Sequence, residues 1–195
     1  MKCKFLGEGA TDKQIIPILL GSHNIDVQQS DFVTWKSLHL RGRKGFKKKV
    51  KLAIGLARLA GLEGLIATLD ADKQPDRIKR LKEARNEDRD DRSKLRFPVV
   101  IGQANPELEA WLLDDTHAVK NGLRLSAQTK VPSPDKVPDV KLALEQLIHD
   151  SSIETNSVGL VSIAELVTCK TSRNPDKTGL RSFIDDARNE LALED

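Results

Sequence analysis

Leu65-Ile66-Ala67-Thr68-Leu69-Asp70-Ala71-Asp72 is the stretch that decides how the rest of the chain is arranged. Its near-continuous apolar run is typical of a β-strand covered on both faces, as in a parallel α/β sheet. The run ends in two carboxylates, and side chains two apart in an extended segment point the same way. Asp70 and Asp72 are therefore predicted to project together from a strand end. Taken alone, such a pair is more often a polar turn than a functional site.

Strands and helices are predicted to alternate along the chain on both sides of this stretch. The apolar patterns predict strands over residues 2–6, 62–69 and 96–101, and one or two short strands within 25–35. Helices are predicted from a capping box at Thr11, from Phe46, over residues 76–94, and from Asn105 with Pro106 in the first turn. Pro17 is expected to kink the first helix or to delay its start. This alternation predicts an open, mostly parallel, Rossmann-like α/β sheet with helices on both faces.

The C-terminal third is predicted to be helical and to follow a long loop. Residues 126–139 are rich in serine and proline, which indicates a loop between an α/β domain over 1–125 and an extension over 140–195. Helices are expected over 140–149, 162–168 and 179–193. We expect this extension to pack on the same domain as a helical cap.

Composition restricts the class of protein. A chain of 195 residues can bury one proper core, and a net charge of +3 does not by itself indicate a nucleic-acid-binding protein. Cys3 and Cys169 match no metal or redox spacing, so two free thiols are expected, although a single disulfide stays open. The first residues lack the apolar core of a signal peptide and no run approaches membrane-spanning length, so we expect a cytoplasmic protein without a membrane partner. The oligomeric state is left open.

Acidic residues stand at the ends of three predicted strands. Glu8 follows the first strand, Asp70 and Asp72 follow the second, and Glu107 and Glu109 come just after the third. Because the carboxyl ends of parallel strands meet at one edge, these groups are expected to converge there. Such a cluster would repel itself unless cations neutralised it, and oxygen ligands suit Mg²⁺ or Mn²⁺. We therefore expect one or two divalent metal sites.

The two glutamates also have a simpler interpretation. Near the start of a helix, Glu107 and Glu109 would complement the helix dipole without any functional role. Glu109, however, shares a helical stripe with Leu112 and Leu113, which predicts that it faces inward. An unpaired buried carboxylate is costly, so a role for Glu109 in the metal site is favoured.

A basic segment lies between the first two acidic positions. Seven of the eleven residues over 41–51 are basic and none is acidic. Placed on a helix, they would form either a solvated face or a stripe that binds the phosphates of nucleic acid independently of sequence. The residues predicted to bind nucleic acid are Arg41, Arg43, Lys44, Lys47, Lys48 and Lys51.

Two segments together are similar to a known domain. Phe5-Leu6-Gly7-Glu8-Gly9-Ala10-Thr11-Asp12, followed by Leu69-Asp70-Ala71-Asp72, resembles the Toprim domain of topoisomerases, primases, certain ribosomal-RNA maturases and overcoming-lysogenization-defect (OLD) nucleases. The segment Asn105-Pro106-Glu107-Leu108-Glu109-Ala110-Trp111-Leu112-Leu113-Asp114 is similar to one in small stand-alone Toprim-like proteins of bacteria, some linked to phage defence. The resemblance spans roughly residues 1–120.

This resemblance implies a role for several acidic residues. Glu8 would be the general base or a metal ligand, and Asp70 and Asp72 would be the metal-binding pair. Glu109, or less favourably Glu107, would be the further acidic ligand of the nuclease-type members.

A basic residue is also implied. Lys73, or one of Lys44, Lys47 and Lys48, would stabilise charge on the reacting phosphate, and no motif decides which. The chain contains no tyrosine, which excludes a tyrosine-linked strand-passing mechanism within it.

Metal-dependent hydrolysis of DNA or RNA is therefore the function we expect, with phage defence as its suggested setting. The alternative is a non-catalytic subunit that binds nucleic acid or a partner ATPase. Because this sequence has no Gly-x-x-x-x-Gly-Lys-Ser/Thr motif, such an ATPase would be a separate polypeptide. A small-molecule phosphotransferase or phosphatase is a third possibility, which the number of basic residues disfavours.

Overall fold

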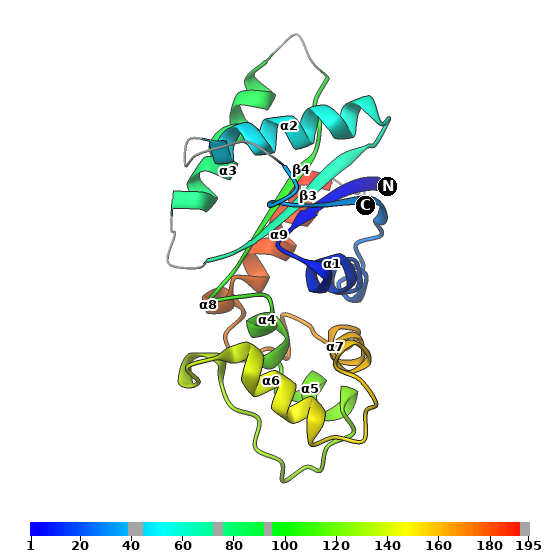
Figure 1. The fold of residues 1–195 in the computed structure, drawn as a ribbon, viewed down its shortest axis with the longest axis vertical. Helices are drawn as coiled ribbons and strands as arrows, with labels where there is room; N and C mark the ends of the chain where they lie inside the picture. Colours follow the sequence, from blue (N-terminus) through cyan, green and yellow to red (C-terminus); the bar gives the residue numbers. More distant parts are fainter. Residues whose placement is uncertain (39–44, 72–75, 92–94, 192–195) are drawn as a thin grey trace.

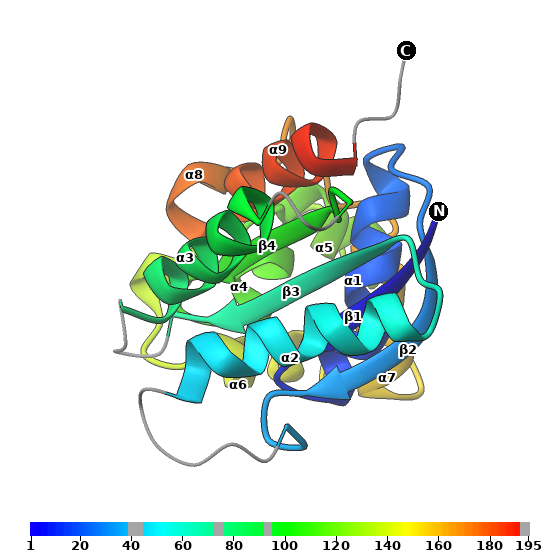
Figure 2. The same cartoon turned by 90° about the horizontal axis from the view of Figure 1, so that it is seen from above.

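The computed structural model describes residues 1–38, 45–71, 76–91 and 95–191, and a parallel β-sheet lies at its centre. The strands are β1 (Lys2–Gly7), β2 (Gln28–Thr34), β3 (Gly64–Asp70) and β4 (Val99–Ala104), in the order β2-β1-β3-β4 (Figure 2). All three pairings are parallel, and Leu6 lies opposite Ala67 while Asp70 lies opposite Ala104. The predicted α/β fold class is confirmed.

The central strands are buried on both faces because alternate apolar residues enter two different cores. One core receives a residue from each of β1, β3 and β4, and so does the other. The first set is Phe5, Ile66 and Val100, and the second is Leu6, Ala67 and Ile101. The continuous apolar run of β3 thus reflects helices on both sides of the sheet.

Helices cover each face of the sheet (Figure 1). On one face lie α2 (Gly45–Leu59) and α3 (Asp76–Asp90), whose buried residues join the second core. On the other lie α1 (Ala10–Ser22) and α9 (Leu180–Leu191), which join the first. No helix within the described ranges is long and apolar enough to cross a membrane.

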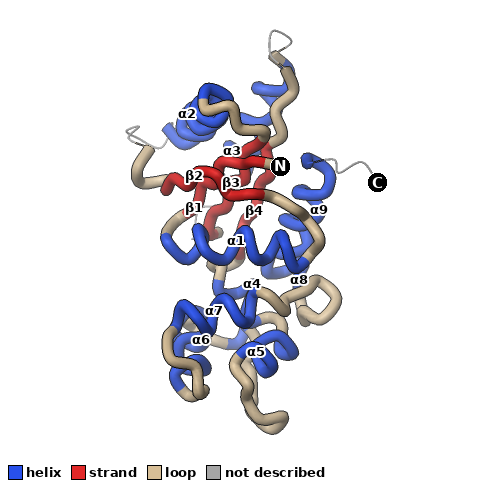
Figure 3. Tube along the Cα trace, turned by 90° about the vertical axis from the view of Figure 1, so that its right-hand side faces the viewer, coloured by secondary structure: helices blue, strands red, loops and turns tan. Residues whose placement is uncertain are grey.

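Four further helices form a lobe below the carboxyl ends of the strands (Figure 3). They are α4 (Glu109–Leu113), α5 (Thr116–Gly122), α6 (Val140–His149) and α7 (Asn156–Ala164). A 3₁₀ turn (Pro134–Lys136) precedes α6, and α8 (Pro175–Thr178) leads back to the sheet.

Trp111 of α4 stacks on Phe183 of α9 with ring centroids 5.0 Å apart, and its indole nitrogen donates to the Thr178 carbonyl at 2.6 Å. The division into separate domains stays a prediction.

β4 is an edge strand of the sheet, and its outer edge is covered by an ion pair between α3 and α9. The Asp186 carboxylate accepts a hydrogen bond from the Ile101 backbone N–H at 2.7 Å. Arg85 donates to both Asp186 oxygens at 2.8 Å and to the Val99 carbonyl at 3.0 Å. An edge N–H that would otherwise be available to a foreign strand is thereby satisfied within the chain.

Two predicted helix starts are wrong. The first helix begins at Ala10, because Gly9 is its cap and the Asp12 carboxylate accepts from the Gly9 N–H at 3.2 Å. It then runs through Pro17 without a delayed start.

The helix expected from Asn105 begins instead at Glu109. The Asn105–Pro106 peptide is cis, and the Asn105 backbone N–H donates to the Thr178 carbonyl, so this residue is bound to α8 rather than capping a helix.

Among the C-terminal helices, those predicted over 140–149 and from residue 179 lie within a residue of α6 and of the start of α9. The helix expected over 162–168 lies earlier, as α7. Thr155 is its cap and accepts a hydrogen bond from the Val158 N–H at 3.3 Å. Both cysteines are free.

Candidate functional site

The carboxyl ends of β1, β3 and β4 bring acidic residues to one edge of the sheet. Asp70 is the last residue of β3, and one of its carboxylate oxygens accepts a hydrogen bond from the Leu108 N–H at 3.2 Å. The Ala71 N–H donates to the carbonyls of Ala104 and Pro106, at 2.7 and 3.0 Å. These bonds hold the segment after β4 against the end of β3, so the acidic residues of both strand ends share one site.

Asp12 is a member of this site that the sequence did not single out beyond its place in the helix start and the Toprim-like segment. It is buried, and its two oxygens accept hydrogen bonds from the Thr68 hydroxyl at 3.0 Å and the Gly9 N–H at 3.2 Å. A Cβ atom at residue 7 would lie 2.7 Å from the Asp12 Cβ, so only glycine allows Asp12 to pack there. The spacing Gly-x-x-x-x-Asp across a strand-to-helix turn is the signal that could have identified it.

Asp70 has a strongly perturbed acidity. Burial, followed by the charges of Asp12, Glu8 and Glu109, raises the pKa of Asp70 from 3.8 to about 7, against the smaller opposing effect of the Leu108 N–H. Negative charge is therefore concentrated here beyond what the surrounding donors neutralise.

Glu109 lies on the side of this site that faces the helical lobe. It is 8% exposed, and burial raises its pKa, with smaller increases from the charges of Glu107 and Asp12. Its own backbone N–H and the Lys141 ammonium act in the opposite direction. The predicted inward orientation of Glu109 agrees with this burial.

The other two glutamates predicted for the site, Glu107 and Glu8, have partners of their own. Glu107 accepts a hydrogen bond from the Lys141 backbone N–H at 3.0 Å, which satisfies a donor in the first turn of α6. Glu8 forms an ion pair with Arg77 of α3 at 3.4 Å. Glu107 thus has a structural role, whereas Glu8 sits close enough to Asp70 to raise its pKa.

Several predicted site residues lie outside the described ranges. They are Asp72 and Lys73 of the metal and catalytic set, and Arg41, Arg43 and Lys44 of the basic segment. Within residues 1–38, 45–71, 76–91 and 95–191, no group of three or more His, Cys, Asp or Glu side chains is arranged to hold a metal ion.

Two lysines of the basic segment contact α3. Lys47 and Lys51 both form ion pairs with Glu87, an interaction that lowers the pKa of Glu87 through their hydrogen bonds. Lys48 is exposed on α2. Two of the residues predicted to bind phosphate are thus already paired with a carboxylate, and Lys48 is the described member best placed to meet a ligand.

Comparisons with known proteins give limited similarity. No family model matches the chain. A probable α-galactosidase B from Neosartorya fischeri is 38% identical over 71 residues, which cover 36% of this chain and 15% of that protein. Among solved structures, the C-terminal region of the OLD protein of Xanthomonas campestris pv. campestris matches over 98% of this chain and 96% of that one, with 17% identity and a TM-score of 0.41. These values do not assign a family, and the Toprim resemblance stays a prediction.

Proposed function

We propose that this protein is a metal-dependent nuclease that hydrolyses phosphodiesters of DNA or RNA at the carboxylate site. The observation that carries the proposal is the convergence of Glu8, Asp12, Asp70 and Glu109 at the carboxyl edge of a parallel sheet. Burial, and then the charges of the other three, raise the pKa of Asp70 there. Ligands of open α/β sheets bind at this edge. The Toprim-like segments seen in the sequence point to the same chemistry.

The donor set fits a hard divalent cation. All of the groups are carboxylates, and their mutual repulsion would be relieved by Mg²⁺ or Mn²⁺. Two of Glu8, Asp12, Asp70 and Glu109 would hold the ion, with Asp72 as a further ligand. Since no complete three-residue group lies within the described ranges, the shell would draw on Asp72 or on water, which Mg²⁺ retains readily. A bound cation would supply an activated water and neutralise charge on the leaving oxygen.

The chain's own residues orient this donor set. The Thr68 hydroxyl and the Gly9 N–H hold Asp12 in place, and the Leu108 N–H holds one oxygen of Asp70. Lys48 on α2 would meet the phosphate backbone of the substrate strand.

A cleavage assay tests this function. Labelled single- and double-stranded DNA and RNA would be incubated with Mg²⁺ or Mn²⁺ and wild-type protein, Asp70→Asn, or the control Asp26→Asn, which changes an exposed carboxylate. We expect metal-dependent cleavage by wild type and the control, and its loss in Asp70→Asn. Failure of the wild type to bind either cation, measured by calorimetry, would remove the proposal.

A non-catalytic subunit that binds nucleic acid or a separate ATPase is the second candidate. The observation that favours it is the lack of a complete three-residue ligand group among the described residues. Cation binding without cleavage of any of these substrates would support this candidate over the first.

A further inference from the structure

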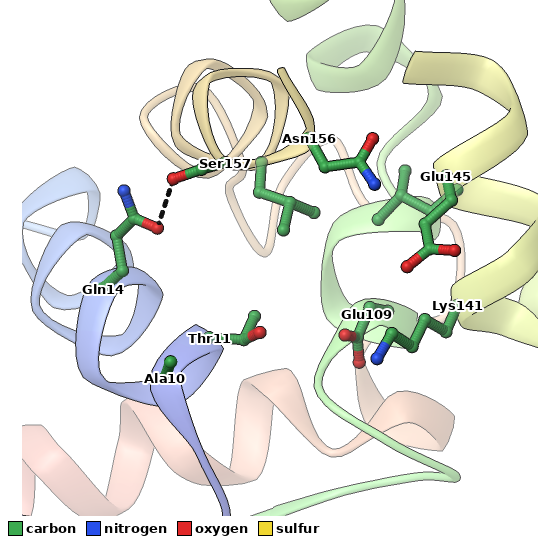
Figure 4. Close-up of a pocket in the computed structure, with 10 residues that line it drawn as sticks. Ala10, Thr11, Gln14, Glu109, Lys141, Glu145, Asn156 and Ser157 are labelled. Carbon is green, nitrogen blue, oxygen red and sulfur yellow. Dashed lines mark hydrogen bonds between the residues drawn. The ribbon is translucent and has the colours of Figure 1, made fainter. Parts of the chain in front are cut away.

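A pocket of about 300 Å³ lies between the helical lobe and the start of α1 (Figure 4). Its walls come from α4, α6 and α7 of the lobe and from α1, which is distant from them in the sequence. The volume is at the lower end of the range typical of small-ligand pockets.

Glu109 joins this pocket to the carboxylate site. Its side chain lines the pocket, yet its charge also raises the pKa of Asp70. Glu109 is buried, and its own backbone N–H and the Lys141 ammonium lower its pKa against the larger effect of burial. A carboxylate that lines a pocket accepts hydrogen bonds, so the pocket suits a ligand that supplies donors.

The charges that line the pocket disfavour an anion. Glu109 and Glu145 bring two carboxylates, and Lys141, which lies beside Glu109, brings one ammonium group (Figure 4). Phosphate would be repelled by this balance, whereas a neutral group rich in hydrogen-bond donors would not.

The remaining lining groups combine amide side chains with apolar surface. The Ser157 hydroxyl donates to the Gln14 side-chain oxygen at 2.8 Å at one side of the pocket (Figure 4). Asn156 brings a second amide, while Leu144 and Leu160 bring apolar surface. Amides and carboxylates are the side chains that read base edges, and unpaired bases are bound in pockets of this kind.

We propose that this pocket takes one unpaired nucleobase of the strand whose phosphodiester lies at the carboxylate site. Because Glu145 can accept a hydrogen bond from an exocyclic amine, bases that carry one (cytosine, adenine, guanine) are preferred over thymine and uracil. This inference rests on the proposed function, which makes the ligand a nucleic-acid strand. It adds a preference for certain bases to that function.

Binding of two oligonucleotides that differ in this amine tests the proposal separately from cleavage. Fluorescein-labelled dC10 and dT10 would be titrated with Asp70→Asn protein, and dissociation constants measured by anisotropy. We expect dC10 to bind about tenfold more tightly than dT10, the size of a hydrogen bond to a charged group. Glu145→Gln in the same background should reduce the ratio to about twofold.

Matched variants keep this test decisive. Glu165→Gln removes the same charge at the exposed C-terminal end of α7, outside the pocket, and should leave the ratio unchanged. Asn156→Leu supplies a second pocket variant in case Glu145→Gln does not fold, as judged by thermal melting. Equal affinities for the two oligonucleotides, binding of neither, or a preference that survives both pocket variants would overturn the inference. A preference without cleavage by wild type would instead remove the nuclease proposal and leave the pocket.

Discussion

Replacing Asp70 with asparagine should stabilise the metal-free protein at alkaline pH. The change keeps the shape of the side chain and the oxygen that accepts from the Leu108 N–H, but it removes one charge from the carboxylate site. A new amide NH₂ also becomes available to the neighbouring carboxylates. The folded state therefore loses the cost of burying this charge and the smaller repulsion from neighbouring carboxylates, neither of which the unfolded chain has.

The size of this effect follows from the pKa of Asp70. Since the folded pKa of about 7 exceeds the ordinary value of 3.8, the folded state binds more protons between these values, and the free energy of unfolding falls as pH rises through them. At 1.36 kcal/mol per pKa unit, the full rise in the Asp70 pKa corresponds to a loss of about 4 kcal/mol in the free energy of unfolding. Because Asp70 is only partly buried, screening by solvent reduces this free energy. We therefore expect Asp70→Asn to raise the free energy of unfolding by about 2 kcal/mol at pH 8.

Thermal and guanidinium unfolding in EDTA would measure the gain. At pH 8, Asp70→Asn should raise the Tm by about 4–8 °C relative to wild type. At pH 5 the gain should be less than half as large, because the folded Asp70 is then protonated in wild type. Added Mg²⁺ should stabilise the wild type more than the variant if Asp70 is a ligand.

Two results would refute this reasoning. One is an equal effect of Asp70→Asn at pH 5 and pH 8, which would mean that charge repulsion is not involved. The other is a similar gain from Asp26→Asn, an exposed control, which would indicate a general effect of net charge.

Three further variants test other parts of the structure. Gly7→Ala should destabilise the protein by about 1–3 kcal/mol in guanidinium unfolding, because its Cβ would lie 2.7 Å from the Asp12 Cβ; an unchanged midpoint would contradict this packing. Asp186→Ala should lower the free energy of unfolding by about 2–4 kcal/mol, since it leaves the Ile101 N–H unpaired and removes one of the two carboxylates that pair with the buried Arg85; a cost under 0.5 kcal/mol would argue against this role. Lys48→Ala should lower the slope of log affinity for DNA against log salt by about 1, measured by anisotropy; an unaltered slope would identify the basic segment as solvated surface.

The sheet was predictable because its signal is local. The apolar run of β3, with glycine before it and carboxylates after it, indicates a strand buried on both faces, and each expected strand overlaps an observed one. Helix starts were predicted less well. At Asn105 the sequence resembles a cap, yet its hydrogen bonds go to α8, some seventy residues later in the chain. Local preference gives way there to a tertiary contact.

The sequence by itself determined the α/β class and the placement of Glu8, Asp70 and Glu109 near strand ends, because strand periodicity and chain order require nothing distant. The Gly-x-x-x-x-Asp spacing is visible in the sequence, but the burial of Asp12 among them depends on tertiary contacts with Gly7 and with the Thr68 hydroxyl of β3. The tertiary structure alone decided that Lys47 and Lys51 pair with Glu87, and that α1, α6 and α7 enclose a pocket beside Glu109. Contacts of this kind depend on how helices from distant segments pack, which no local pattern records.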